Sequence, residues 1–200
     1  MLFVIIIHAV GLVGLSSPWR DQFVQLTSIN LFLTAAVVFE EVWKRNLKSF
    51  QVLALLFALG LGIEITGVQT GFPFGEYSYG TVMGPKIAGV SVSIGLNWYY
   101  LIVCAVGVVR LFSKSTLVAV LLAPVILTLF DFLIEPVAIT LEYWSWAEVS
   151  VPFTNYLAWY LVSIPMVYIY LRWTNDPPVK FPAQVLLLQA VFFVVLNTLM

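Results

Sequence analysis

The chain has 200 residues, of which 62% are hydrophobic and only 10% are charged, and its formal net charge is -1. Soluble domains are about 45–50% apolar and about 25% charged, so the composition excludes an ordinary soluble protein. The near-neutral charge argues against nucleic acid as a partner. One membrane span needs roughly 17–25 apolar residues, so this length allows six or seven spans joined by short loops. We predict an all-α, polytopic transmembrane helix bundle that forms a single domain over residues 1–200.

Apolar runs predict seven spans, and Pro or Gly marks several of the junctions between them. The predicted spans are residues 2–15, 24–42, 50–68, 92–112, 117–138, 155–171 and 183–199. The first is interpreted as a span and not as a signal peptide, because it has neither a basic leading segment nor a small-residue cleavage site.

The distribution of Lys and Arg predicts the orientation of the bundle. The loops after the second, fourth and sixth spans contain Lys44, Arg45, Lys48, Arg110, Lys114, Arg172 and Lys180, whereas the other loops contain Arg20 and Lys86. Because cytoplasmic loops are enriched in basic residues, we expect the N-terminus in the cytoplasm.

Two polar and aromatic segments, residues 64–85 and 131–159, interrupt the apolar pattern. They contain more than half of the ten acidic residues and none of the nine basic residues. The predicted orientation places both segments toward the extracytoplasmic side. A carboxylate at the bilayer centre costs at least about 2.5–3.5 kcal/mol, so acidic residues that persist there without a basic partner indicate a site where protons are handled.

Glu64, Asp131 and Glu135 are the candidate catalytic residues. Glu64 and Asp131 each lie about 14 residues into an outward-running span, so their depths are similar and they could face one cavity. Asp131 and Glu135 are four residues apart and share a helix face, directly before Pro136. A carboxyl that stays protonated near neutral pH can act as a general acid. The alternative is a structural carboxyl that accepts hydrogen bonds from Tyr, Trp or Asn across the bundle.

Aromatic and amide side chains around these acids are candidates for binding. The loop at residues 71–79 combines Gly, Pro and aromatic residues, including Phe74, Tyr77 and Tyr79, with Glu76, and such a bent loop can fold back to line a cavity. Trp144 and Trp146, which follow Asp131 and Glu135 in the chain, could stabilise a cation. The alternative for both groups is an aromatic belt at the membrane interface. Asn97 and Asn155 either orient a water or a carboxyl, or join helices.

A metal site is not expected from this sequence. His8 is the single histidine and Cys104 the single cysteine, and together they cannot form a His/Cys metal site. We therefore interpret His8 as a residue of the helix bundle.

The two segments together resemble the integral-membrane carotenoid hydratases of the bisanhydrobacterioruberin hydratase type. The resemblance rests on Glu64, Gly67, the loop at residues 71–79 (GFPFGEYSY), Gly84 to Lys86, Gly89, Val90, Trp98, Asp131, Glu135 to Ala138, Trp144 to Trp146, Val151, Pro152, Asn155 and Trp159. The chain departs from the family pattern at Glu135, where Asp is usual, and at Ser150 and Ala158, where Gly is usual.

The resemblance implies addition of water to the terminal C1–C2 double bond of an acyclic carotenoid end group, without a metal or redox cofactor. Asp131 or Glu64 would protonate the alkene and Glu135 would position the water, although the three roles could be exchanged. The predicted substrate-binding residues are Phe74, Glu76, Tyr77, Tyr79, Asn97, Trp98, Trp144, Trp146, Asn155 and Trp159. The alternatives are a membrane carotenoid cyclase of the lycopene type, which would use the same protonation, and a small non-enzymatic transporter.

The expected partners are a membrane-dissolved carotenoid, the lipid bilayer and other carotenoid enzymes. The expected location is the cytoplasmic membrane of a prokaryote.

Overall fold

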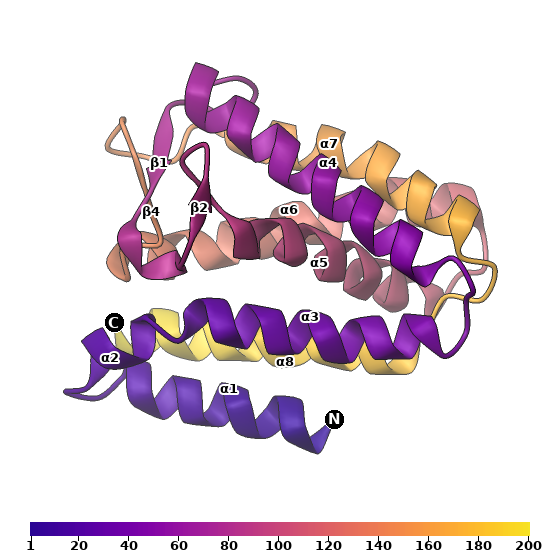
Figure 1. The fold of residues 1–200 in the computed structure, drawn as a ribbon, viewed down its shortest axis with the longest axis horizontal. Coiled ribbons are helices and arrows are strands. Elements are labelled where there is room, and N and C mark those ends of the chain that lie inside the picture. The colour runs from indigo at the N-terminus through magenta and orange to yellow at the C-terminus, as the bar shows by residue number, and fades with distance from the viewer.

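Seven long helices run side by side, and a short helix and two small β-ribbons lie at one end of them (Figure 1). The structure is a computed structural model that describes residues 1–200. The long helices are α1 (Leu2–Leu15), α3 (Thr27–Trp43), α4 (Ser49–Thr70), α5 (Val92–Arg110), α6 (Thr116–Thr140), α7 (Phe153–Trp173) and α8 (Lys180–Leu199). Each overlaps one of the seven predicted spans over most of its length. A short helix α2 (Arg20–Val24), which the sequence analysis did not predict, joins α1 to α3.

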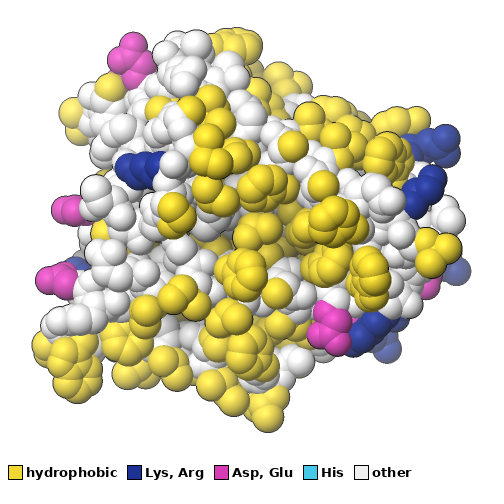
Figure 2. Space-filling model, viewed as in Figure 1, with side chains coloured by type: hydrophobic (Ala, Val, Ile, Leu, Met, Phe, Trp, Pro, Cys, Tyr) yellow, Lys and Arg dark blue, Asp and Glu magenta, His cyan; other side chains and the backbone are white.

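Four of these helices, α4, α5, α6 and α8, are long and apolar enough to cross a membrane, and α1 is a shorter apolar helix. Figure 2 shows hydrophobic side chains over the middle of the molecule, with charged side chains gathered toward its two ends. This separation fits a helical bundle that lies in a bilayer. The crossing of the membrane by α1, α3 and α7, and the cytoplasmic N-terminus, stay predictions.

Helix α5 lies at the centre of the bundle and contacts α3, α4, α6, α7 and α8. Small residues on α5 allow neighbouring chain segments to approach closely. A Cβ at Gly95 would lie 2.7 Å from the Phe57 ring of α4, and a Cβ at Gly107 would lie 3.0 Å from the Val179 carbonyl oxygen before α8. The sequence of α5 therefore sets how tightly its neighbours pack around it.

Helix α6 continues without interruption through Pro124 and Pro136. Proline cannot donate a backbone hydrogen bond, so Pro136 leaves the carbonyl one turn back, at Phe132, without its helical donor. Polar side chains bind two other carbonyls close to Pro136. Thr140 donates from Oγ1 to the Pro136 carbonyl at 2.8 Å, and Asn197 of α8 donates from Nδ2 to the Leu133 carbonyl at 2.8 Å.

Two antiparallel β-ribbons correct the prediction of a purely α-helical protein. Strand β1 (Tyr77–Tyr79) pairs with β4 (Trp144–Trp146), and β2 (Lys86–Ile87) pairs with β3 (Val90–Ser91). Both β1 and β4 read aromatic–Ser–aromatic, and this period of two places their aromatic rings on one face. Helix α4 ends at Thr70, and the next residue, Gly71, has a left-handed φ of 74° that favours glycine. The chain can then turn back toward the bundle to form β1.

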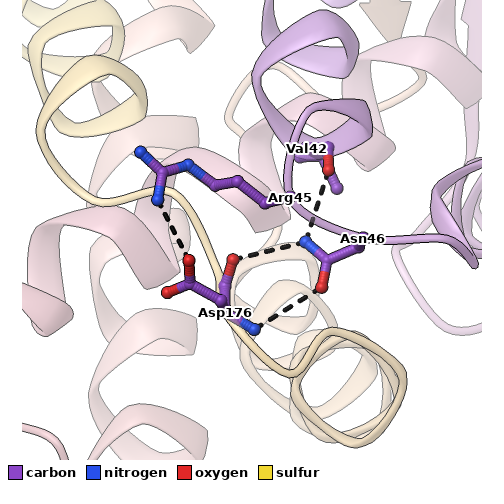
Figure 3. A network of polar contacts seen from close by, with 4 residues as sticks. All are labelled: Val42, Arg45, Asn46 and Asp176. Carbon is purple, nitrogen blue, oxygen red and sulfur yellow. Dashed lines mark hydrogen bonds and ion pairs between the residues drawn. The ribbon is translucent and has the colours of Figure 1, made fainter.

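A polar cluster joins two loops at the opposite end of the bundle (Figure 3). Asn46, after α3, donates from Nδ2 to the carbonyl oxygens of Val42 and Asp176, each at 3.3 Å. Its Oδ1 accepts from the Asp176 backbone N–H at 3.5 Å, and Arg45 pairs with the Asp176 carboxylate at 3.0 Å. The α3–α4 and α7–α8 loops are thereby held together.

Candidate active site

The two polar and aromatic segments meet around one cavity of about 30 Å³. Helices α4, α5, α6 and α7 and strands β1 and β4 contribute its walls. The lining residues are Glu64, Phe74, Tyr77, Tyr79, Ile94, Asn97, Asp131, Glu135, Trp144, Trp146, Asn155 and Trp159. All three candidate catalytic carboxyls and eight of the ten predicted binding residues are in this set.

Glu64 of α4 is buried and accepts three hydrogen bonds from side chains. Its Oε2 accepts from the Tyr77 hydroxyl at 2.6 Å and from the Tyr79 hydroxyl at 2.7 Å. Its Oε1 accepts from the Trp98 indole N–H at 2.9 Å. Both oxygens of this carboxyl are therefore occupied by donors from the protein itself.

Glycines on either side of Glu64 make room for these donors. A Cβ at Gly60 would lie 2.5 Å from Trp98 Cβ, and a Cβ at Gly67 would lie 2.7 Å from the Tyr77 hydroxyl oxygen. Both distances are closer than real side-chain contacts. The Gly spacing around Glu64 on one helix face thus lets an indole and a phenol reach the same carboxyl.

The two tyrosines of β1 are constrained to act as donors. Burial, followed by the nearby Glu64 carboxyl, raises the pKa of the Tyr77 and Tyr79 hydroxyls well above the ordinary tyrosine value. Both phenols therefore keep their protons at neutral pH. Lys86 lies outside the cavity and donates from Nζ to the Tyr79 carbonyl oxygen at 2.6 Å, which fixes the backbone of this strand.

Asp131 of α6 has a different environment from Glu64. It is 3% exposed, and it accepts one side-chain hydrogen bond, from Asn155 Nδ2 of α7 to Oδ2 at 2.7 Å. No protein group donates to Oδ1. Asp131 is thus the least occupied of the three carboxyls.

Glu135 lies one turn further along α6 and accepts from two tryptophans of β4. The indole N–H groups of Trp144 and Trp146 both bind Oε2, each at 3.0 Å. Because alternate residues of a strand share a face, the intervening Ser145 points away from the carboxyl and is exposed.

Aromatic rings form much of the remaining wall. Trp98 and Trp159 stack with centroids 4.1 Å apart, and Trp98 is packed behind Glu64 and is not itself a lining residue. Across the β1–β4 ribbon, Tyr77 lies 5.1 Å from Trp146 and Tyr79 lies 6.1 Å from Trp144, measured between ring centroids. These faces could stabilise a cation held within the cavity.

The structure does not bring Glu76 into the cavity. It immediately precedes β1, its side chain is exposed, and the strand alternation directs it to the face opposite Tyr77. Ile94 lines the cavity but was not predicted, because an isoleucine within an apolar helix carries no distinguishing signal. Asn97 lines the cavity and makes no side-chain hydrogen bond to the protein.

No basic side chain lines the cavity. The ion pairs of the protein, Lys44 with Glu40 and Glu41 and Arg45 with Asp176, lie on the surface at the other end of the bundle. No group of three or more His, Cys, Asp or Glu side chains is arranged to hold a metal ion. His8 is buried in α1, where its Nδ1 contacts the Val4 carbonyl oxygen at 2.8 Å.

The fold and the site together define a helical membrane protein with a buried, acidic and aromatic cavity. The chain belongs to the carotenoid biosynthesis protein family, which it matches over residues 25–200. It is 33% identical over 118 residues to bisanhydrobacterioruberin hydratase of Haloarcula japonica, an alignment that covers 54% of this chain. The chain spans 40% of the length of that relative. No solved structure matches the chain. The resemblance inferred from the sequence motifs is confirmed.

Proposed function

We propose that this chain is a carotenoid hydratase, which adds water to the terminal C1–C2 double bond of an acyclic carotenoid end group. The observation that carries the proposal is the convergence of Glu64, Asp131 and Glu135 on one cavity of about 30 Å³ beneath aromatic rings. The name of the 33% identical relative supports hydration as the reaction. A substrate dissolved in the bilayer explains why an enzyme of this kind lies within the membrane.

Asp131 is the proton donor in this proposal. Glu64 accepts three hydrogen bonds and Glu135 accepts two, and each donor favours the ionised carboxylate over the protonated acid. Asp131 accepts only one hydrogen bond, so of the three carboxyls it is the least biased toward the ionised form and the best able to give a proton to the substrate.

The reaction balances without a cofactor. The Asp131 proton passes to C2 as the C1–C2 π bond breaks, which leaves a tertiary cation at C1. A water oxygen then bonds to C1 and releases a proton to the Glu135 carboxylate. Transfer of that proton back to Asp131, one helical turn away, restores the starting state, so that alkene and water give a tertiary alcohol.

The cavity volume supports water as the nucleophile. A buried water needs roughly 10–15 Å³ of such space and two to four polar partners, so about 30 Å³ holds one or two waters beside carboxyl oxygens. The aromatic rings of β1 and β4 shield the cation until the water reacts.

Expression of the chain in a host that accumulates lycopene or γ-carotene tests the proposal. Liquid chromatography with mass spectrometry should detect pigments heavier by one water. An isomer of unchanged mass would identify a cyclase, and unchanged pigment from a well-expressed protein would contradict both reactions.

Substitution of the carboxyls tests their roles. Asp131→Asn should lower product formation about 10²–10⁴-fold, as loss of a general acid does. Glu64→Gln and Glu135→Gln should also lower product formation, and full activity of all three variants would refute the assignment.

We further propose that the N-terminus is cytoplasmic. The loops α3–α4, α5–α6 and α7–α8 meet at one end of the up-and-down bundle, and these loops together with the helix ends beside them carry seven of the nine basic residues. The positive-inside rule then assigns that end to the cytoplasm and the cavity to the extracytoplasmic half.

A further inference from the structure

A second and larger cavity lies between α1, α3, α5, α6 and α8. Its volume is about 280 Å³, and 18 of its 24 lining residues are hydrophobic. None of the lining residues is Asp, Glu, Lys or Arg. Ligand pockets in proteins are about 300–1,000 Å³, so this space is large enough to hold a substantial part of an apolar ligand.

The two cavities are neighbours that share part of their walls. Ile94 and Asn97 of α5 and Trp144 of β4 line both of them. The Trp144 indole donates to Glu135 from this dividing position. Asn97 and Trp144 therefore form part of the partition between the large cavity and the carboxyls.

The large cavity also reaches the lipid-facing surface of the bundle. Lining residues of α1 and α3 are substantially exposed, with relative exposures of 50% for Ile6, 54% for Val10 and 54% for Ile29. An apolar exposed border of this kind fits access from the acyl-chain region of a bilayer and not from water.

We infer that the large cavity binds the hydrocarbon chain of an acyclic isoprenoid, while the carboxyl cavity receives only the end group. This inference rests on the proposed function, because the end group is the part that reacts. A space of about 30 Å³ is too small for more than the end of such a chain, and the wall of the neighbouring cavity is uncharged and mostly apolar. The two cavities thus divide one long substrate between a binding region and a reacting region.

Gly11 of α1 offers a way to fill the large cavity. A Cβ added there would lie 3.7 Å from Phe192 and 3.8 Å from Asn30, which are both lining residues, so the addition itself makes ordinary contacts. A larger side chain at this position extends between α1, α3 and α8. Gly62 of α4 is a matched control, because it is exposed and a Cβ there meets nothing within 4 Å.

The experiment measures binding without turnover, in the Asp131→Asn background. Protein is purified into phospholipid nanodiscs that contain lycopene, and bound pigment per protein is measured by absorbance after removal of free pigment. We expect Gly11→Trp to lower bound lycopene at least 10-fold and Gly11→Leu to lower it less, while Gly62→Trp leaves it unchanged. Equal amounts of bound pigment in Gly11→Trp and Gly62→Trp would overturn the inference. It would also be overturned if phospholipid acyl chains displaced the bound lycopene to the same extent in all variants.

A second measurement separates this inference from the proposed function. An acyclic monoterpene with the same terminal double bond needs the carboxyl cavity but little of the large one. In the protein that retains Asp131, Gly11→Trp should reduce hydration of lycopene at least 10-fold. The same variant should reduce hydration of the monoterpene less than 2-fold. Equal losses on both substrates would contradict a chain-binding role. Absence of hydration in every variant would refute the proposed function, while the pigment-binding result would still decide the role of the large cavity.

Discussion

Asn155 of α7 donates a hydrogen bond from Nδ2 to Oδ2 of Asp131 on α6, across 2.7 Å between two buried side chains. This amide fixes the orientation of the carboxyl that we propose as the proton donor. The other carboxyl oxygen, Oδ1, accepts no hydrogen bond from the protein. The packing of α6 against α7 therefore sets the orientation of this carboxyl.

We expect Asn155→Leu to lower kcat about 10-fold or more with a smaller change in KM, because Asp131 loses its single donor while the substrate keeps its apolar contacts. Product formation in membranes with varied substrate concentration measures both quantities. Asn155→Gln, which retains the amide, should recover part of the loss. A change confined to KM would show that Asn155 acts in substrate binding and does not orient Asp131.

Gly67 controls the position of Tyr77 against Glu64. Because a Cβ at residue 67 would lie 2.7 Å from the Tyr77 hydroxyl and 2.8 Å from the Phe74 ring, we expect Gly67→Ala to destabilise the fold by about 1–3 kcal/mol. Thermal unfolding in detergent measures this as a lower Tm. Gly62→Ala on the same helix is the control and should be neutral or slightly stabilising, since alanine favours helix. Equal Tm values for the two variants would contradict the close approach.

Thiol labelling tests the orientation of the bundle. Ser145 of β4 is exposed at the cavity end, Lys114 is exposed in the α5–α6 loop at the other end, and the native Cys104 is buried. In intact cells, a membrane-impermeant maleimide should label Ser145→Cys and should label Lys114→Cys only after lysis. The reverse pattern would place the N-terminus outside.

The polar cluster of Arg45, Asn46 and Asp176 allows an exposed ion pair to be compared with a buried amide. Exposed ion pairs contribute about 0–1 kcal/mol, so Arg45→Ala should change the stability little. Asn46 is 9% exposed and contacts both backbone groups of Asp176, and unpaired buried polar groups cost about 1–3 kcal/mol. Asn46→Ala should therefore lower the Tm more than Arg45→Ala. The opposite ranking would show that the charge pair dominates this contact.

The helices could be predicted from the sequence because apolar runs of span length leave few alternatives in a membrane protein. The β-ribbons could not be predicted with the same information. The triplets Tyr77–Tyr79 and Trp144–Trp146 are too short for a strand pattern, and their partners are far apart in sequence. Pairing depends on how α4 and α6 position the two segments, and this is a property of the tertiary structure.

The carboxyls could be recognised because unpaired acids in apolar spans are unusual. Their distinct surroundings could not be recognised, since the three donors to Glu64 and the single donor to Asp131 come from three different elements, β1, α5 and α7. Glu76 shows that membership of a loop motif does not predict which side chains face the cavity. Its neighbours Phe74, Tyr77 and Tyr79 line the cavity, but the strand alternation directs Glu76 away from it.

The pairing of β1 with β4 also determines when the cavity can form during synthesis. Ser78 and Ser145 are adjacent across the ribbon but 67 residues apart in the chain. Helices α4, α5 and α6 must therefore be inserted before the ribbon closes, and Asn155 must follow on α7 before Asp131 gains its donor. Nascent chains that end before residue 155 would carry all three carboxyls but would lack the contact that orients Asp131, so this arrangement of side chains is completed late in biogenesis.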